Sequence, residues 1–406
     1  MNPLQPESKL ASLVQPLSVS EFREQYLGKK AAHIKGDSDR FSSLFGWTQF
    51  NRLLNSAPAP HPSSRLFKDK EKCPVARDAL DVIRHAQHGA TVIVEDADRY
   101  DDKLGAFLDT LSSEIGEPTR TNIYASSVGH QGFPLHYDTH DFLILQVEGF
   151  KRWRVFPSTI PSPLFFQKTH GIARPDEDQL YLECTLARGD VLYVPRGHWH
   201  EALAEREPSL HLTLGVFWRT GIDFLSWLVD ELREDEVLRR SFPLVLRDEA
   251  SSDTQTPAAY YDHFMQVKEA IGGALDRGRD LLEAFLTHNV AVQKNRCPFA
   301  FPFHLLGEDI GVSLDAEFER PERMCRLVRR REESVDLVGA GKVLIQFGID
   351  TFPVLKLIFS RTTFIGRELL PHAPGLGHDD IRDVLAVLLR EGLIIPRRCD
   401  AEAAKR

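Results

Sequence analysis

Residues 131–156 read QGFPLHYDTHDFLILQVEGFKRWRVF, and this stretch decides the fold that we expect for the first half of the chain. His136 and Asp138 stand at the mouth of an apolar run. In a β-strand, residues i and i+2 point to the same face. We therefore expect an imidazole and a carboxylate side by side at the start of a long strand.

A second stretch, residues 188–202, reads RGDVLYVPRGHWHEA. It predicts a turn at Gly189-Asp190, a strand over 191–194, and a proline-glycine break before the histidines of the segment HWH. An apolar strand over 210–218 follows. Well-separated strands that each carry metal-binding side chains are typical of a cupin-type barrel.

Two histidines and one carboxylate on one side of a metal leave its other side open, which suits non-haem Fe(II) oxygenases. Our working hypothesis is that His136, Asp138 and His200 hold such a metal inside a β-barrel. His198 lies two residues before His200 and is the alternative ligand.

The surrounding residues extend these two stretches into a long collinear pattern. Its parts are Asn122-Ile123-Tyr124, Gly132-Phe133, His136-Tyr137-Asp138, Gln146-Val147-Glu148-Gly149, Lys151, Trp153, Gly189-Asp190, 192–197 (LYVPRG), His200 and 209–213 (SLHLT). On this pattern, residues 1–220 resemble the JmjC-type cupins, which are Fe(II)- and 2-oxoglutarate-dependent oxygenases. Within them the chain is most similar to the ribosomal oxygenases, which hydroxylate ribosomal proteins.

The resemblance implies roles for individual residues. His136, Asp138 and His200 match the iron ligands, and His200 is selected over His198 because the family places its ligand at the end of PRG-x-x-H. Lys151 falls where the family has the basic residue that pairs with the distal carboxylate of 2-oxoglutarate. A lysine is a compact point charge suited to one end of a dianion.

Three more residues are implied as cosubstrate contacts. Asn122 matches a polar contact on a neighbouring strand, and Tyr124 and Thr213 belong to the same part of the pattern. One position departs from the family, because a serine is expected after Thr213-Leu214 and this chain has Gly215. We expect His140 and His211 to pack in the barrel or to support the site without binding the metal.

Length and hydrophobic patterning predict an α+β chain of several domains. At 406 residues it exceeds one ordinary core. We expect a double-stranded β-helix (cupin/JmjC) catalytic domain with surrounding helices over 1–220 and a helical domain over 221–312. A linker and a winged-helix-like domain are expected over 313–406. The resemblance implies that the helical domain mediates homodimerisation.

Local patterns predict the secondary structure around these stretches. Expected helices are 18–26, 41–55, 76–85, 103–115, 222–238, 257–289, 363–370 and 379–390; expected further strands are 31–34, 91–94, 343–347 and 393–396; expected loops or linkers are 57–64, 157–179, 248–256, 317–333 and 374–377. The long segment 157–179 is expected to shape substrate entry.

Composition excludes several classes of function. The formal net charge is −9, and the hydrophobic and charged contents of 42% and 27% are those of a globular protein. This charge argues against general nucleic-acid binding. Helix 379–390 likewise carries more acidic than basic groups. Five scattered cysteines, no apolar run of membrane length and no signal-peptide pattern predict a cytoplasmic protein with reduced thiols.

The leading hypothesis is an oxygenase that uses Fe(II), 2-oxoglutarate and O2 to hydroxylate a side chain of a protein or peptide, with a ribosomal protein favoured by resemblance. The alternatives are a tailoring hydroxylase of a biosynthetic peptide or small molecule, a lysine demethylase, and a non-catalytic cupin binding module. We expect a homodimer and no membrane partner.

Overall fold

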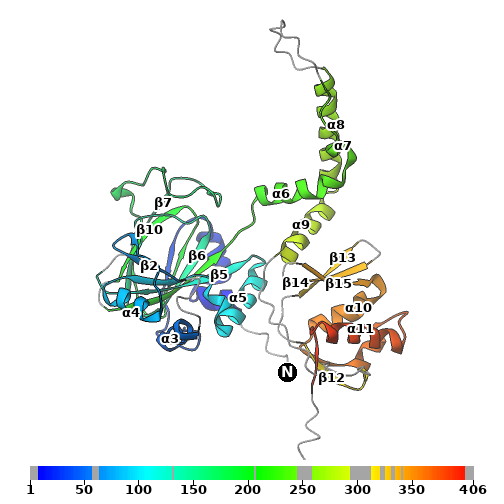
Figure 1. The fold of residues 1–406 in the computed structure, drawn as a ribbon, viewed down its shortest axis with the longest axis horizontal. Helices are drawn as coiled ribbons and strands as arrows, with labels where there is room; N and C mark the ends of the chain where they lie inside the picture. The colour runs from blue at the N-terminus through cyan, green and yellow to red at the C-terminus, as the bar shows by residue number, and fades with distance from the viewer. Residues whose placement is uncertain are drawn as a thin grey trace, which may run out of the picture. The chain divides into compact units, whose positions relative to one another are not determined.

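The computed structural model describes residues 8–56, 64–129, 132–204, 207–244, 258–292, 312–320, 325–330, 334–339 and 342–397. The chain forms two compact units, residues 1–218 and 219–406 (Figure 1). Each unit is described by itself. A further division near residue 312 stays a prediction.

The first unit is built from two antiparallel sheets. An eight-stranded sheet has the order β1-β9-β6-β11-β5-β4-β2-β3, and a three-stranded sheet has the order β10-β7-β8. The strands are β1 (Ala32–Ile34), β2 (Ser64–Lys68), β3 (Glu71–Lys72), β4 (Thr91–Val94), β5 (Thr119–Ser126), β6 (Asp141–Glu148), β7 (Lys151–Ser158), β8 (Leu182–Leu186), β9 (Val191–Val194), β10 (His198–Ala204) and β11 (Ser209–Val216). A mixed fold with a large antiparallel sheet is therefore confirmed. Strands β2, β3 and β8 were not predicted.

Strand β11 lies between β5 and β6, and its register sorts the side chains onto two faces. Thr213 is opposite Asn122, and His211 is opposite Tyr124, which places these polar residues together on the inner face. The alternating residue Leu212 is fully buried in the core of the outer face. An apolar cluster between the two sheets, which includes Phe142 and Trp153, fills part of the interior.

Helices supply the partner for the outer face of the large sheet. They are α1 (Lys9–Val14), α2 (Val19–Gln25), α3 (Trp47–Ser56), α4 (Ala79–Gln87) and α5 (Asp102–Ile115), with 3₁₀ turns η1 (Ala97–Arg99) and η2 (Glu177–Gln179). Leu104, Leu108 and Leu111 of α5 are buried in the same core as Leu143 and Leu145 of β6. The expectation that these helices cover the barrel is confirmed.

The turn before β9 is fixed by Asp190. Its carboxylate accepts hydrogen bonds from the amides of Ala187 at 3.0 Å and Gly36 at 3.1 Å, and it pairs with His33 Nε2 at 2.9 Å. Gly189 has φ +92°, and a Cβ there would stand 1.9 Å from the carbonyl oxygen of Asp37. Only glycine fits this turn, which sets where β9 begins.

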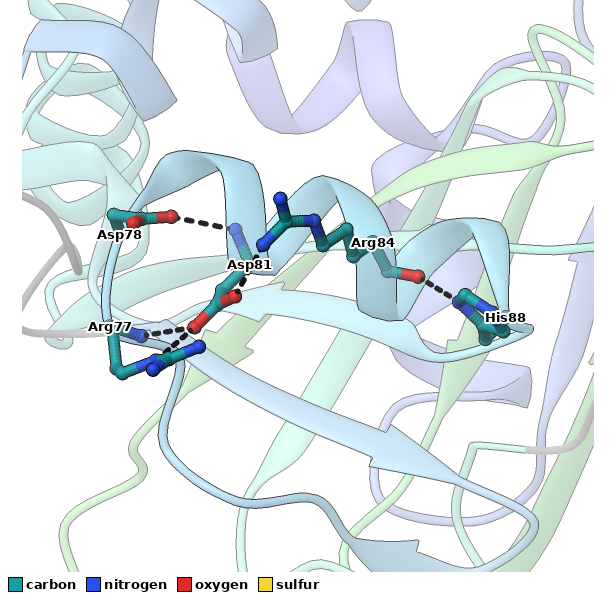
Figure 2. A network of polar contacts seen from close by, with 5 residues as sticks. All are labelled: Arg77, Asp78, Asp81, Arg84 and His88. Carbon is teal, nitrogen blue, oxygen red and sulfur yellow. Dashed lines mark hydrogen bonds and ion pairs between the residues drawn. The ribbon is translucent and has the colours of Figure 1, made fainter.

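Helix α4 begins at Ala79, three residues later than predicted, because Asp78 caps it. The Asp78 side chain accepts from the amide of Asp81 at 2.8 Å. Asp81 in turn accepts from Arg77 Nε at 2.8 Å and from Arg84 at 3.3 Å (Figure 2). The hydrogen bond from Arg77 lowers the pKa of Asp81 to about 2, so this network stays charged at neutral pH.

The second unit contains helices and two small antiparallel sheets, ordered β13-β14-β15 and β16-β12-β17. Its elements are α6 (Gly221–Glu231), η3 (Leu232–Glu234), α7 (Glu236–Arg239), α8 (Ala258–Leu275), α9 (Arg279–Val292), β12 (Glu317–Glu319), β13 (Cys325–Arg330), β14 (Ser334–Gly339), β15 (Lys342–Gly348), η5 (Ile349–Thr351), α10 (Phe352–Ser360), β16 (Thr363–Ile365), η6 (Gly366–His372), α11 (His378–Arg390) and β17 (Ile395–Pro396).

Three predicted helices differ from the structure. The helix expected over 41–55 begins only at Trp47, after a run of turns. The helix expected over 222–238 ends at Glu231, and a 3₁₀ turn and a short helix follow it. The helix expected over 257–289 is divided into α8 and α9 near Gly278, where φ is +51° and favours glycine.

The C-terminal predictions were partly wrong. Residues 317–333 contain strands β12 and β13 where a linker was expected, and residues 363–370 form β16 and a 3₁₀ turn where a helix was expected. Phe364 pairs with Phe318 across β12 and β16, so tertiary pairing prevails over helical spacing. Helix α10 was missed because its apolar run resembles a strand, although Pro353 suits a first helical turn.

The remaining expectations have mixed outcomes. Helices over 18–26, 103–115 and 379–390 and strands over 31–34, 91–94, 191–194, 210–218, 343–347 and 393–396 are confirmed within a few residues. Residues 57–63 and 248–256 lie outside the described residues. In the described ranges, Cys73 and Cys184 are free thiols, and no helix has both the length and the apolarity that a bilayer crossing requires.

Candidate metal centre

His136, Asp138 and His200 converge in the first unit. One candidate ligand atom from each of the three lies within 4.8 Å of the others. His200 Nε2 is 3.7 Å from Asp138 Oδ2, and the two imidazole centroids are 4.3 Å apart. The two stretches of sequence therefore present two imidazoles and one carboxylate to a common point.

Backbone hydrogen bonds hold the two histidines together. The amide of His200 donates to the carbonyl of His136 at 2.7 Å, and the amide of His136 donates to the carbonyl of His200 at 3.2 Å. This isolated β-bridge joins residues that lie 64 positions apart in the chain. The geometry of the site is thus part of the fold itself.

A second tie links the turn before β10 to the start of β6. The amide of Gly197 donates to the carbonyl of Asp138 at 2.8 Å, and the amide of Arg196 donates to Asp141 Oδ1 at 2.9 Å. Buried Asp141 also accepts from the hydroxyl of Tyr193 at 2.5 Å. Gly197 has φ +82°, which explains the glycine in this turn.

Hydrogen bonds also set which ring nitrogen each histidine presents. His136 Nδ1 lies 2.8 Å from the carbonyl of Pro134, and His200 Nδ1 lies 3.1 Å from the carbonyl of His198. A carbonyl only accepts, so each Nδ1 carries a proton, and in the neutral ring Nε2 is the nitrogen that keeps a lone pair. This is the tautomer that a metal ligand requires.

The protonation states of His200 and Asp138 also suit the binding of a divalent cation. Burial lowers the pKa of His200 to about 3, so its ring is neutral at pH 7. Burial alone would raise the pKa of Asp138. The nearby His140, His136 and His200 outweigh it, and the pKa lies below its ordinary value. A neutral imidazole and an ionised carboxylate are the forms that bind metal.

His198, the alternative ligand, faces elsewhere. Its Nδ1 lies 2.7 Å from the hydroxyl of Tyr181, and it is not part of the three-residue cluster. The pairing of β10 with β7 shifts register between His198 and Trp199. This irregularity removes the i, i+2 equivalence that spacing would give His198 and His200.

The three residues line a cavity inside the barrel that also contains most of the predicted cosubstrate contacts. Its other lining residues include Lys151, Tyr124, Thr213, Thr91, Phe133, Trp153 and His211. Asn122 does not line it, and its Oδ1 instead accepts from the amide of Asp96 at 3.0 Å. Tyr124 stacks on His211 with centroids 4.8 Å apart. Burial raises the pKa of Tyr124 above its ordinary value, so its hydroxyl stays protonated.

Lys151 is a buried cation, with 6% of its surface exposed. Its Nζ donates to Ser126 Oγ at 2.8 Å, and it forms no ion pair within the described part of the chain. Burial lowers its pKa to about 7. A buried ammonium without a counter-charge is costly, which indicates a site for an anion.

Two further polar atoms on this cavity lack partners. Trp153 Nε1 and His211 Nδ1 are buried without a hydrogen bond among the described residues. Burial, followed by the charge of Lys151, lowers the pKa of His211 well below its ordinary value, so the ring is neutral. Buried polar atoms are normally satisfied. Lys151, Trp153 and His211 thus form one group of unsatisfied positions on the cavity.

Sequence reasoning missed Ser126 as the partner of Lys151 and gave His211 only a supporting role. Spacing could have found Ser126, because it follows Asn122 and Tyr124 at i+2 intervals on the inner face of β5. The structure gives a reason for Gly215 where a serine was expected. The ring of His140 occupies the space that a side chain at position 215 would need. A Cβ at Gly215 would stand 2.8 Å from His140 Cδ2.

Residues 94–224 match the family model described as JmjC domain. Most of the matched residues belong to the first unit, which ends at Trp218. Ribosomal oxygenase 2 of Rattus norvegicus is 28% identical over 262 residues, which cover 59% of this chain and 55% of that protein. The bifunctional lysine-specific demethylase and histidyl-hydroxylase NO66 of Dictyostelium discoideum is 27% identical over 226 residues, covering 51% and 42%. The chain thus spans about half the length of these curated relatives.

Solved structures share the fold of this chain over most of its length. The structure of YcfD, a ribosomal oxygenase from Escherichia coli, in complex with cobalt and 2-oxoglutarate has a TM-score of 0.56 at 15% identity, and the match covers 94% of this chain and 99% of that one. Another structure of E. coli YcfD gives a TM-score of 0.60 at 16% identity, covering 94% and 98%. The chain therefore resembles the ribosomal oxygenases in both sequence and fold.

Proposed function

We propose that the chain is an Fe(II)- and 2-oxoglutarate-dependent oxygenase that hydroxylates a side chain of a polypeptide. The observation that carries this proposal is one cavity lined by two different sets of groups. His136, Asp138 and His200 offer ligands for a divalent metal, and Lys151 offers a buried positive charge. A metal and an anionic cosubstrate are the two partners that these groups lack.

Fe(II) held by these three residues would supply the oxidising chemistry in the presence of O2 and 2-oxoglutarate. The protein's own part is to bind and to orient. The Nδ1–H groups of His136 and His200 donate to carbonyls and keep both Nε2 atoms directed at one point. Asp138 contributes the negative charge that partly neutralises a dication.

Lys151 would pair with the distal carboxylate of 2-oxoglutarate. Its Nζ is already oriented by Ser126. Trp153 Nε1 offers one more donor on the same cavity, and His211 Nδ1 offers a position that donates or accepts according to its tautomer. Tyr124 and Thr213 line the cavity and provide hydroxyls, whereas Asn122 would act indirectly, through a hydrogen bond with Tyr124.

A ribosomal protein is the substrate that the relatives favour. Both the Rattus norvegicus relative and the E. coli structure carry the name ribosomal oxygenase. Segment 159–176, between β7 and η2, is well placed to contact a macromolecule, because Phe165 and Phe166 are exposed and Tyr137 anchors the segment through a hydrogen bond to the carbonyl of Gln167 at 3.1 Å. Such a substrate implies a cytoplasmic site of action.

The test is incubation of the full chain with Fe(II), 2-oxoglutarate, O2 and ribosomes from the host cell. We expect succinate formation and a gain of one oxygen on one ribosomal protein, both lost in Asp138→Ala. The proposal fails if no polypeptide gains oxygen while the protein is loaded with iron. Succinate without an oxidised polypeptide in any host extract would point to a small-molecule substrate instead.

We also propose that the helical part of the second unit mediates homodimerisation. Leu225 and Val229 of α6, Phe264 of α8, and Leu282 and Leu286 of α9 are all large apolar side chains with more than two-fifths of their surface exposed. Such residues favour a protein partner. Sedimentation at micromolar concentration should show a dimer, and the paired substitution Val229→Asp/Phe264→Asp should give a monomer, whereas the surface variant Glu269→Lys should not.

The C-terminal part we propose to be a winged-helix-like module that binds protein, not DNA. Helix α11 carries Asp379, Asp380 and Asp383 against Arg382 and Arg390, and Arg382 is paired with Asp379. This surface would repel a phosphate backbone. Fluorescence anisotropy with labelled duplex DNA at low salt should show no binding, and saturable binding would overturn this assignment.

A further inference from the structure

Three hydrogen-bonded links tie together the two stretches that carry the proposed metal ligands. Two of them are made by the backbone alone, the β-bridge between the two histidines and the bond from the Gly197 amide to the Asp138 carbonyl. The third link uses a side chain, because the amide of Arg196 donates to Asp141 Oδ1 at 2.9 Å. This third link depends on the identity of a residue, so a substitution can remove it and leave the other two in place.

Asp141 begins strand β6 on the face of the sheet that packs against the helices. Leu143 and Leu145, which alternate with it along β6, lie in the apolar core of the outer face. Asp141 is buried as well, with 2% of its surface exposed, and it forms no salt bridge among the described residues. A buried carboxylate without a counter-charge costs stability, and an apolar side chain would pack there at lower cost. Its presence indicates a role other than the stability of the fold.

Tyr193 of β9 holds the second oxygen of this carboxylate. Its hydroxyl lies 2.5 Å from Asp141 Oδ2. Burial raises the pKa of Tyr193 above its ordinary value, so the hydroxyl keeps its proton and is the donor. The hydroxyl oxygen accepts in turn from the amide of Gly28 at 2.7 Å, and the ring of Phe22 packs edge-on against Tyr193 with centroids 4.9 Å apart. The carboxylate is therefore held in one orientation by groups on both of its oxygens.

The position of this carboxylate bears on two of the proposed ligands. Asp138 lies three residues before Asp141, ahead of the strand. His200 lies four residues after Arg196. The link therefore fixes, from one side, the separation of Asp138 Oδ2 and His200 Nε2, which is 3.7 Å. Groups that act together in a site must be held to within about 0.5 Å of the productive arrangement.

We propose that Asp141, oriented by Tyr193, is a positioning residue that holds the Asp138 carboxylate and the His200 imidazole at the spacing that a divalent metal requires. Asp141 is not one of the three residues whose ligand atoms converge, so it acts through the turn before β10. This inference rests on the proposed function, because it concerns the same metal centre. It adds to the three ligands a residue that the sequence patterns did not single out.

The test is binding of Co(II) to the full chain without 2-oxoglutarate or substrate. Co(II) accepts the same kinds of ligand as Fe(II), and its visible absorption depends on how those ligands are arranged. Asp141→Asn keeps the shape of the side chain, but the amide nitrogen then faces either the Arg196 amide or the Tyr193 hydroxyl, and one donor loses its acceptor. We expect the affinity for Co(II) to fall about 10–100-fold and the absorption spectrum to change.

Tyr193→Phe tests the same link from its other side. It leaves the Asp141 carboxylate in place and removes one of its two donors. We expect the affinity for Co(II) to fall about tenfold, the lower end of the range for residues that support a ligand.

Asp98→Asn is the matched control for these variants. Asp98 is also a buried carboxylate, with 7% of its surface exposed, and it accepts from a backbone amide, that of Thr121, at 2.8 Å. Neither residue belongs to the metal cluster or lines its cavity. We expect Asp98→Asn to lower the unfolding temperature and to leave the affinity and the spectrum of Co(II) unchanged.

The outcomes separate this inference from the proposed function. If the wild-type protein binds no Co(II), the metal centre and the proposed function fail together. If it binds Co(II) and Asp141→Asn matches Asp98→Asn in both affinity and spectrum, Asp141 only stabilises the fold, and the positioning role is wrong while the proposed function stands. Unfolding temperature is measured for each variant. If Asp141→Asn does not fold, Tyr193→Phe decides, and wild-type affinity in that variant would overturn the inference.

Discussion

The two faces of the eight-stranded sheet have opposite characters. On the outer face, Leu143 and Leu145 of β6 are buried with the helices in one continuous apolar core. On the inner face, Lys151 from the facing sheet and His211 are equally buried, yet His211 Nδ1 has no hydrogen bond among the described residues. The outer face stabilises the fold, whereas the unsatisfied polar groups of the inner face cost stability until something binds them.

The largest effect that tests this difference between the two faces is a loss of turnover at the proposed metal ligands. His136→Ala removes one of the three proposed ligands, and we expect turnover to fall about a thousandfold, more than the 10–100-fold typical of residues that only support a ligand. The unfolding temperature should stay within a few degrees, because the backbone bridge to His200 does not need the imidazole. Succinate release and thermal melting measure the two effects.

His198→Ala is the matched control for that experiment, since His198 lies two residues from the proposed ligand His200 and contacts Tyr181 instead. We expect it to retain most of the turnover. Equal losses in the two variants would contradict the assignment of His200 over His198.

The next largest effect concerns Lys151. Lys151→Met keeps the length of the side chain and removes the charge, and we expect the 2-oxoglutarate requirement to rise about 100-fold, within the 2–5 kcal/mol lost when one partner of a buried charge pair is removed. The same change should raise the unfolding temperature of the protein without 2-oxoglutarate, because an unmatched buried charge disappears. Lys103→Met, at an exposed position, should change neither quantity.

A substitution in the apolar core of the outer face should lower the stability of the fold and leave turnover nearly unchanged. Leu145 is fully buried, and Leu145→Ala should lower the free energy of unfolding by about 2–5 kcal/mol, the range for such cavities. Turnover per folded molecule should stay within about twofold, since the apolar core only supports the sheet. A large loss of turnover without loss of stability would contradict the conclusion that the outer face serves only the stability of the fold.

The smallest effect is a dependence on pH. Burial lowers the pKa of Lys151 from 10.5 to about 7. Above pH 7, Lys151 loses its proton when no 2-oxoglutarate is bound. The affinity for 2-oxoglutarate should therefore fall by up to about tenfold per pH unit. Between about pH 7 and 10.5 the unfolded chain binds the proton and the folded one does not, so stability without 2-oxoglutarate should rise with pH. Lys151→Met should flatten both profiles, as calorimetry can show.

The convergence of His136 and Asp138 was predicted from their i, i+2 spacing beside an apolar run, but the expectation that they begin the strand was wrong. Strand β6 begins only at Asp141, and His136 forms an isolated bridge to His200 before it.

The exclusion of His198 could not be predicted, because it depends on a register irregularity that sequence spacing does not reveal. Asn122 illustrates the same limit. Its strand and face were predictable, but its hydrogen bond to the loop at Asp96 directs it away from the cavity.

Local patterns failed most in the C-terminal part, where short elements take their structure from their neighbours. Thr363 to Ile365 is a strand because β12 lies beside it, and the apolar run of α10 has no alternation that distinguishes a buried helix from a strand. The polar groups without partners on the inner face were also unpredictable, because satisfaction of a donor depends on distances between strands.

The reciprocal amide bonds between His136 and His200 bear on how the centre would be loaded. The two imidazoles lose their conformational entropy when the chain folds, so metal binding does not carry the cost of ordering them. Loading and removal should then proceed without refolding, unlike in zinc fingers, where the ion creates the fold. Such a ready-made centre discriminates weakly among divalent ions, and the availability of each ion would decide which of them occupies it.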